Sequence, residues 1–224
     1  MNTKNKVDCL FLITKSSSKT YQKLSVTYSA IEPPTWALLL AQSMRAVGNE
    51  VRILDANAED LSQEDILKKI VFFSPRLICI VVYGQNVNAG TTNMSGAIFV
   101  SKYLKDKNIN IPISIIGSHV QALPIETLEK EKSIDFVFTN EGVYALRNIL
   151  KLKNFSVEEL EKIKGIAYRK NNRIVLSMPE KIVPSEKMDE DLPGYAWDLL
   201  PYKDTPLDLY RSPMWHAEYN FEKR

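Results

Sequence analysis

The chain has 224 residues, 45% of them hydrophobic and 25% charged, which is typical of a soluble globular protein. Lys and Arg number 29 and Asp and Glu number 27, and this near-neutral balance argues against a nucleic-acid-binding protein with its clustered basic face. The first apolar run contains Asp8 and is too short for a membrane span or a signal peptide, so we expect a cytoplasmic protein.

Apolar segments with the length of strands alternate with helical patterns over the first 150 residues. Strands are predicted at 7–14, 51–54, 77–82, 113–116 and 136–139, and helices at 36–47, 62–73, 94–105, 124–130 and 143–150. This alternation indicates a parallel sheet with helices on both faces, and right-handed crossovers leave few topologies. The sequence therefore predicts a flavodoxin-like α/β fold with a five-stranded parallel sheet in the order 2-1-3-4-5.

The pattern changes after residue 150. A short helix is predicted at 156–164, followed by a β-hairpin at 165–177 whose turn, Lys170-Asn171-Asn172, suits positive φ. Residues 178–193 are charged and contain prolines, which predicts an extended linker. The apolar patch 194–201 interrupts it and is expected to fold back or to mediate a homodimer. The predicted units are 1–150, 151–180 and 181–224.

Cys9 and Cys79 lie in apolar runs and are predicted to be reduced core residues. Two isolated cysteines cannot hold an iron–sulfur cluster, which normally takes several closely spaced thiolates. The sequence therefore predicts no cluster on this chain.

The loops that follow the strands meet at the carboxyl edge of a parallel sheet, where ligands bind in such folds. Glycines and amides dominate these loops, and glycine lets backbone approach a ligand closely. This composition suits a large, flat, amide-bearing cofactor or a phosphate group better than a catalytic triad, although glycine at strand ends also serves turns alone. The candidate binding residues are Thr14, Ser16, Ser17, Tyr83, Gly84, Gln85, Asn86, Gly117, Ser118, His119, Val120, Asn140, Glu141 and Gly142.

Three of the polar residues at this edge leave alternatives open. His119 lacks companions at ligand spacing, so a ligand contact or a structural role is favoured over metal ligation. Glu141 could bind a ligand or cap the helix that begins at Val143. Asp55 could accept a ribose hydroxyl, but no G-x-G-x-x-G follows the first strand, and G-x-x-x-x-G-K-[ST] and G-x-S-x-G are also absent. No catalytic residue and no metal ligand is predicted.

A set of motifs occurs in one order along the chain. They are Asn49-Glu-Val-Arg-Ile-Leu-Asp55, Tyr83 at a strand end, Ile116-Gly-Ser-His-Val-Gln-Ala-Leu-Pro124, Ile134-Asp-Phe-Val-Phe-Thr-Asn-Glu-Gly142, Gly165-Ile-Ala-Tyr-Arg169 and Leu192-Pro-Gly-Tyr-Ala-Trp-Asp-Leu-Leu-Pro201. Together they resemble the N-terminal cobalamin-binding domain of the cobalamin-dependent radical SAM enzymes, over about residues 7–201. The resemblance implies a flavodoxin-like sheet with the corrin across its carboxyl edge, near residues 83–86, 117–119 and 141–142.

The sequence departs from that family at several points. Ser118 stands where a second glycine is usual, and Asn140 where Arg or Gly is usual. The motif D-x-H-x-x-G is absent after the first strand, so the resemblance implies a cobalt without a His ligand from residues 14–20. The C-x-x-x-C-x-x-C motif of the radical SAM barrel is also absent, so a 4Fe-4S cluster and S-adenosylmethionine are not expected on this chain.

The expected function is that of a cobalamin-binding module of a radical SAM methyltransferase-type enzyme, not catalytic by itself. Its partners would be cobalamin and either a radical SAM domain or subunit or a second copy of the chain. The chain would then be a truncated gene product, an excised domain or a split subunit. The alternatives are a non-catalytic flavodoxin-like domain that binds a ligand or a partner, and an enzyme with its own chemistry at the same edge.

Overall fold

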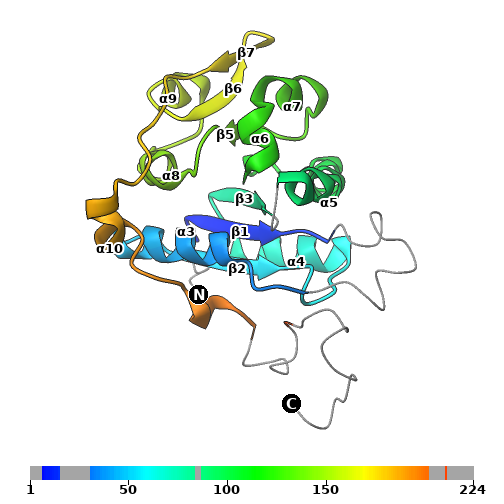
Figure 1. Cartoon of the computed structure of the whole chain (residues 1–224). Helices are drawn as coiled ribbons and strands as arrows, with labels where there is room; N and C mark the ends of the chain where they lie inside the picture. The colour runs from blue at the N-terminus through cyan, green and yellow to red at the C-terminus, as the bar shows by residue number, and fades with distance from the viewer. Residues whose placement is uncertain (1–6, 16–30, 84–86, 202–209, 211–224) are drawn as a thin grey trace.

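The computed structural model of the protein describes residues 7–15, 31–83, 87–201 and 210. Seven strands form one sheet in the order β2-β1-β3-β4-β5-β6-β7 (Figure 1). They are β1 (Cys9–Ile13), β2 (Val51–Asp55), β3 (Leu77–Val82), β4 (Ile113–Gly117), β5 (Phe136–Phe138), β6 (Ile166–Lys170) and β7 (Arg173–Leu176). The first five are parallel, which confirms the predicted order 2-1-3-4-5.

The prediction of a five-stranded sheet is wrong because the hairpin joins the sheet. β6 pairs antiparallel with β5, with Phe138 opposite Ile166, and β7 pairs antiparallel with β6. Without this pairing the outer edge of β5 would leave backbone N–H and C=O groups unpaired. The hairpin itself turns as predicted, since Asn171 and Asn172 adopt φ values of 48° and 63°.

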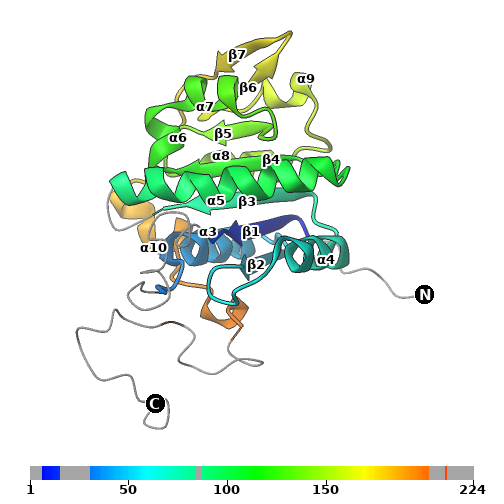
Figure 2. The ribbon, with the colours of Figure 1, turned by 90° about the vertical axis from the view of Figure 1, so that its right-hand side faces the viewer.

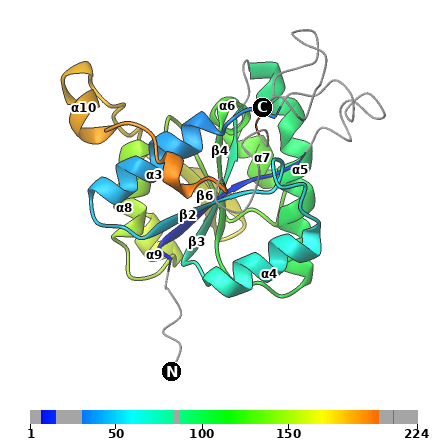
Figure 3. The same cartoon turned by 90° about the horizontal axis from the view of Figure 1, so that it is seen from below.

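Helices cover both faces of the sheet (Figure 3). One face carries α3 (Thr35–Ala46), α8 (Val143–Leu150) and α9 (Val157–Leu160), and the other carries α4 (Gln63–Phe73), α5 (Val87–Asp106), α6 (Ser118–Ala122) and α7 (Pro124–Lys130). Successive side chains of a strand point to opposite faces, so Phe11 joins the core under α3 and α8, while Leu10 and Leu12 join the other. None of the helices within the described ranges is long and apolar enough to cross a membrane.

Helix α5 is longer than predicted. It begins at Val87 rather than near Met94, so the Gly-, Asn- and Thr-rich segment that we expected as a loop is helical. With 20 residues it lies along the sheet beside β3 and β4 (Figure 2). The low helix propensity of Gly90 is outweighed here by the packing of α5 against Ser118.

Residues 178–201, which we call the strap, run from β7 back across α8 and α3. They contain two short 3-10 helices, Ser185–Lys187 and Trp197–Leu199, and the helix α10 (Met188–Asp191), so the prediction of an extended linker holds only in part. Ala196 and Leu200 are buried in the core beneath α3. The apolar patch therefore folds back onto the domain only in part, because Tyr195 and Trp197 stay 44% and 43% exposed.

Candidate functional site

The predicted site residues follow strands that end at the same edge of the sheet. Thr14 follows β1, Tyr83 follows β3 and Ser118 follows β4, while Asn140 lies two residues beyond β5. Because these strands are parallel neighbours, their carboxyl ends meet. Five of the predicted residues, namely Ser16, Ser17, Gly84, Gln85 and Asn86, lie outside the described residues.

The segment Gly117–Ser118 is packed tightly at this edge. A Cβ at Gly117 would lie 2.0 Å from the carbonyl oxygen of Val82, so only glycine lets β4 approach β3 so closely. The chain does not turn here as predicted, because α6 begins directly at Ser118. Val120, the next predicted residue along this helix, is buried.

The hydroxyl of Ser118 is the unusual polar group of this segment. Its oxygen is buried and has no hydrogen-bond partner among the described residues. Leaving a buried hydroxyl unpaired costs about 1–3 kcal/mol. Such a group in a folded protein therefore needs an explanation, and a bound ligand supplies one.

Two glycines bring α5 against the same edge. A Cβ at Gly90 would lie 2.2 Å from the Ser118 hydroxyl oxygen, and one at Gly96 would lie 2.5 Å from the carbonyl oxygen of Lys15 and 3.0 Å from Thr14 Oγ1. These contacts explain why the Gly-rich segment is helical, since only residues without a Cβ allow the helix to pack there. Helix α5 thus forms one wall of the site.

His119 faces α5 and not a group of ligating side chains. Its Nδ1 lies 3.1 Å from Thr91 Oγ1. Partial burial lowers the pKa of His119, and the charge of Lys130 lowers it further, so the imidazole is neutral at pH 7. Within the described ranges no three His, Cys, Asp or Glu side chains are grouped to hold a metal ion.

In the turn Asn140–Gly142 the side chains are occupied by the chain itself. Asn140 accepts a hydrogen bond from Gly142 N (2.9 Å) and donates one to the carbonyl oxygen of Glu180 in the strap (3.1 Å). The Glu141 carboxylate accepts one from Val183 N, also in the strap (2.5 Å). Helix α8 has no side-chain cap, so Glu141 holds the strap and does not cap this helix.

Two residues that we did not predict connect the edge loops. Gln121 Nε2 donates to the hydroxyl of Tyr83 (2.6 Å) and to the carbonyl oxygen of Asn140 (2.8 Å). Trp36 Nε1 donates to the carbonyl oxygen of Glu141 (3.2 Å), and its ring lies 5.5 Å from that of Tyr83. We call Trp36, Tyr83, Gln121 and Asn140 the edge network.

The edge network presents aromatic surface rather than charge. Burial raises the pKa of Tyr83 to about 12, and the hydrogen bond from Gln121 opposes this rise only in part, so the phenol stays neutral. Local sequence gave little sign of these partners, because Trp36 lies 105 residues from Glu141. The position of Gln121, four residues beyond the strand-end Gly117, was the one available signal.

Asp55 lies at the carboxyl end of β2, and its carboxylate is also occupied. Oδ1 accepts a hydrogen bond from Ala58 N (3.0 Å) and Oδ2 one from the hydroxyl of Tyr210 (3.1 Å). Burial raises the pKa of Asp55 to about 6 against the lowering effect of these hydrogen bonds. This disfavours the alternative in which Asp55 accepts a ribose hydroxyl, because both carboxylate oxygens already accept hydrogen bonds within the chain.

Comparison with known proteins gives a consistent family. The family profile described as "B12 binding domain" matches residues 22–150. An uncharacterized methyltransferase of Pyrococcus horikoshii is 30% identical over 180 residues, 80% of this chain and 36% of that protein. The anaerobic magnesium-protoporphyrin IX monomethyl ester cyclase of Synechocystis is 24% identical over 173 residues, 76% of this chain and 32% of that protein. The chain therefore spans about a third of the length of these curated relatives.

Solved structures share the fold. The radical S-adenosylmethionine methyltransferase TsrM from Kitasatospora setae, with tryptophan substrate and a SAM analog bound, gives a TM-score of 0.56 at 16% identity and covers 78% of this chain and 30% of its own. The cobalamin-dependent S-adenosylmethionine radical enzyme OxsB gives 0.58 at 15% identity, covering 86% of this chain and 24% of its own.

Proposed function

The chain belongs to the B12 binding domain family, and on this premise we propose that it holds cobalamin at the carboxyl edge of its sheet, as the cofactor module of a radical SAM methyltransferase-type enzyme. The proposed contacts are Thr14, Tyr83, residues 117–120 and the backbone of the turn 140–142, with Ser16, Ser17 and residues 84–86 in the adjoining loops. Cobalamin as the cofactor follows from the family. Its placement and the enzyme class are the parts that need testing.

One observation carries the placement of the cofactor, namely the buried Ser118 hydroxyl without a partner. It is held in place by close packing, since Gly90 lies against the hydroxyl and Gly117 lies against the carbonyl oxygen of Val82. The neighbouring Tyr83 and Trp36 offer aromatic surface to a large flat ring. The residues present at this edge therefore fit an amide-bearing macrocycle with few charges.

When bound, cobalamin supplies a cobalt that can carry a methyl group. The chain's own residues would bind and orient it: the Ser118 hydroxyl by a hydrogen bond and Tyr83 by its neutral ring. His119, held toward Thr91 and neutral at pH 7, would be a contact rather than a metal ligand. Residues 14–20 contain no His, so that loop would supply no His ligand to the cobalt.

The enzyme class rests on the relatives. One curated relative is named as a methyltransferase, and the solved neighbours are radical SAM enzymes that share the fold. The chain covers about a third of the curated relatives, so the methyl acceptor and the radical chemistry belong to what lies beyond this domain in them. A radical SAM domain or subunit would be its partner.

Titration with hydroxocobalamin tests the binding. We expect a shift in the visible spectrum, co-elution on gel filtration and a micromolar Kd. A spectrum without a histidine-ligated cobalt is expected, and a histidine-ligated spectrum that is lost in His119→Ala would contradict the assignment of His119 as a contact. No binding at micromolar concentrations would instead favour a domain that binds another ligand or a partner.

A further inference from the structure

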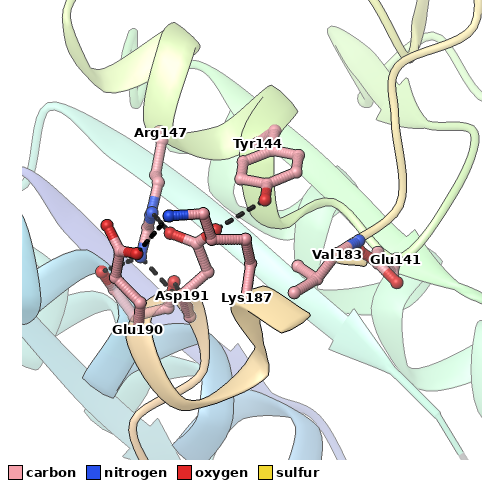
Figure 4. A network of polar contacts seen from close by, with 8 residues as sticks. Glu141, Tyr144, Arg147, Val183, Lys187, Glu190 and Asp191 are labelled. Carbon is pink, nitrogen blue, oxygen red and sulfur yellow. Dashed lines mark hydrogen bonds and ion pairs between the residues drawn. The ribbon is translucent and has the colours of Figure 1, made fainter. Parts of the chain in front are cut away.

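Asp191, in α10 of the strap, ties together three elements that are far apart in sequence. Its carboxylate accepts hydrogen bonds from the hydroxyl of Tyr144 (2.5 Å) and from Arg147, both on α8 (Figure 4). Its backbone carbonyl accepts one from Ser43 on α3 (2.6 Å) and a second from Arg147 (3.0 Å). Asp191 thus contacts α8 and α3 at once, whereas other contacts of the strap, such as Asn148 with Glu180 and Arg45 with Asp198, each reach one helix.

The ion pair between Arg147 and Asp191 is the least exposed among the described residues, with 11% of each side chain accessible. The hydrogen bond from Tyr144 and the charge of Arg147 lower the pKa of Asp191, and the same contact raises the pKa of Tyr144 to about 12. Replacing one partner of such a pair leaves the other charge buried and unpaired. The strap position is therefore strongly specified by this contact.

A continuous set of hydrogen bonds leads from the strap to the candidate site. Glu180 O and Val183 N bind the side chains of Asn140 and Glu141. The carbonyl oxygen of Asn140 in turn accepts from Gln121, which also donates to Tyr83. Figure 4 shows the two attachments side by side, with Glu141 and Val183 beside the cluster around Asp191.

Helix α3 contacts both the strap and the turn Asn140–Gly142. Ser43, which binds the strap, and Trp36, which binds the carbonyl oxygen of Glu141, lie on the same helix. Tyr144 and Arg147 lie in the first turns of α8, directly after Gly142. Fixing α8 and α3 to one another at Asp191 therefore fixes both sides of the turn that supports Gln121 and Tyr83.

We propose that Asp191 is a positioning residue of the cofactor site: by holding the strap on α8 and α3 it keeps the turn Asn140–Gly142, and through Gln121 the ring of Tyr83, in the arrangement that binds cobalamin. The inference rests on the proposed function. It makes the strap a control element, because anything that displaces the strap lowers the affinity of the edge for the cofactor.

The test uses Asp191→Asn with Glu190→Gln as its matched control. Glu190 is the neighbouring acid on α10, and it pairs with the exposed Lys187 at 2.5 Å. Two quantities are measured on the full chain: the hydrogen exchange of amides 139–142 and the Kd for hydroxocobalamin. Allosteric couplings typically span 5–150-fold, so we expect about 10-fold weaker binding and faster exchange in Asp191→Asn, and neither in Glu190→Gln.

A second control separates positioning from loss of stability. Ile70→Ala creates a cavity in the core on the other face of the sheet, away from the strap. At a temperature where both variants are folded, Ile70→Ala should bind hydroxocobalamin as the unaltered chain does. Equal weakening in Ile70→Ala and Asp191→Asn would overturn the positioning role.

The outcomes also separate the inference from the proposed function. If the unaltered chain binds no cobalamin, the proposed function fails. Independently of that result, unchanged hydrogen exchange at 139–142 in Asp191→Asn would refute the strap contact as a support of the turn. If cobalamin binds and Asp191→Asn changes neither its Kd nor the exchange, the inference is wrong and the function stands. Should Asp191→Asn not fold, Tyr144→Phe removes one hydrogen bond and keeps the ion pair; a Kd within twofold of the unaltered chain then counts against the inference.

Discussion

Two segments at the carboxyl edge of this sheet, Asn140–Gly142 and Gly117–His119, are alike in sequence and differ in structure. Both contain glycine and small polar residues after a buried strand. In Asn140–Gly142 the side chains of Asn140 and Glu141 are hydrogen-bonded within the chain. In Gly117–His119 a buried hydroxyl has no partner among the described residues. The polar side chains of the first segment are thus already engaged, whereas the second contains a hydroxyl that is not, and this is why the proposed direct contact with a ligand is assigned to Ser118.

The largest expected effect on stability comes from replacing the glycine of each segment, Gly117 or Gly142, with alanine. In Gly117→Ala the new Cβ meets the carbonyl oxygen of Val82 at 2.0 Å, and backbone inside a sheet cannot yield. In Gly142→Ala it meets the flexible end of Ile116 at 2.2 Å, with the additional strain of a φ of 82°. We expect the free energy of unfolding, measured in urea, to fall by about 3 kcal/mol or more in Gly117→Ala and by about 2 kcal/mol in Gly142→Ala. The reverse order would contradict the tight β3–β4 approach.

The second effect is a pH dependence that distinguishes the strap side from the β2 side. The folded-state pKa of Asp55 is raised from 3.8 to about 6, so its contribution to stability is fully present below pH 3.8 and is lost as the pH rises through 6. The shift of roughly two units corresponds to at most about 3 kcal/mol. Asp55→Asn should remove this slope, so its stability relative to the unaltered chain rises between pH 4 and pH 7.

Asp191 on the strap side has the opposite sign. Its folded-state pKa is lowered, so its contribution is present above the unfolded value near 4 and is lost as the pH falls below it. Hydrogen exchange at residues 139–142 should therefore stay constant between pH 5 and 7, after correction for intrinsic rates, and accelerate below pH 4. A strap that loosens between pH 5 and 7 would contradict this assignment.

A smaller effect is expected for Asn140→Ala. The substitution removes the hydrogen bonds with Gly142 N and Glu180 O, each worth about 1 kcal/mol. The free energy of unfolding should therefore fall by about 2 kcal/mol. Chemical denaturation measures the change. Asn148→Ala is the matched control, because its amide binds the same strap residue through the side chain at 3.3 Å and lies away from the turn.

The smallest stability effect, and the one of opposite sign, is expected for Ser118→Ala. Removing an unpaired buried hydroxyl should leave the ligand-free domain unchanged or stabilise it by about 1 kcal/mol, while hydroxocobalamin binds about 10-fold more weakly. Ser114→Ala, in the preceding strand β4, is the control, since its buried hydroxyl already donates to Ile78 O. Unaltered affinity in Ser118→Ala would remove the observation on which the placement of the cofactor rests.

Much of the fold could be predicted because it depends on local signals. Alternating apolar segments located the five parallel strands, and the rule of right-handed crossovers ordered them. The helix predicted to begin at Ser62 is present, and the Ser62 hydroxyl caps it by accepting a hydrogen bond from Asp65 N at 3.2 Å. The hairpin was recognised, but its pairing with β5 was not, because an antiparallel partner for an edge strand carries no local sequence mark.

The site could be predicted only as a set of loops. Gly117 and Gly142 were identified by residue type, and the structure supplies the reasons in Val82 and Ile116. Which polar groups remain available was not readable, since Glu141 and Asn140 are engaged by a strap about 40 residues away. The helical start of α5 was also missed, because the contact of Gly90 with Ser118 outweighs its helix propensity.

The sequence by itself determined the alternation of strands and helices, the order of the parallel strands and the edge at which the strand-end loops meet, because these follow from periodicity, chirality and backbone conformation. Only the tertiary structure decided that the hairpin extends the sheet, that Asp191 contacts both α8 and α3, and that the buried hydroxyl of Ser118 lacks a partner among the described residues. The physical reason is separation along the chain: Ser43 and Asp191 lie 148 residues apart, and hydrogen bonds between such residues form only once the core has brought them together.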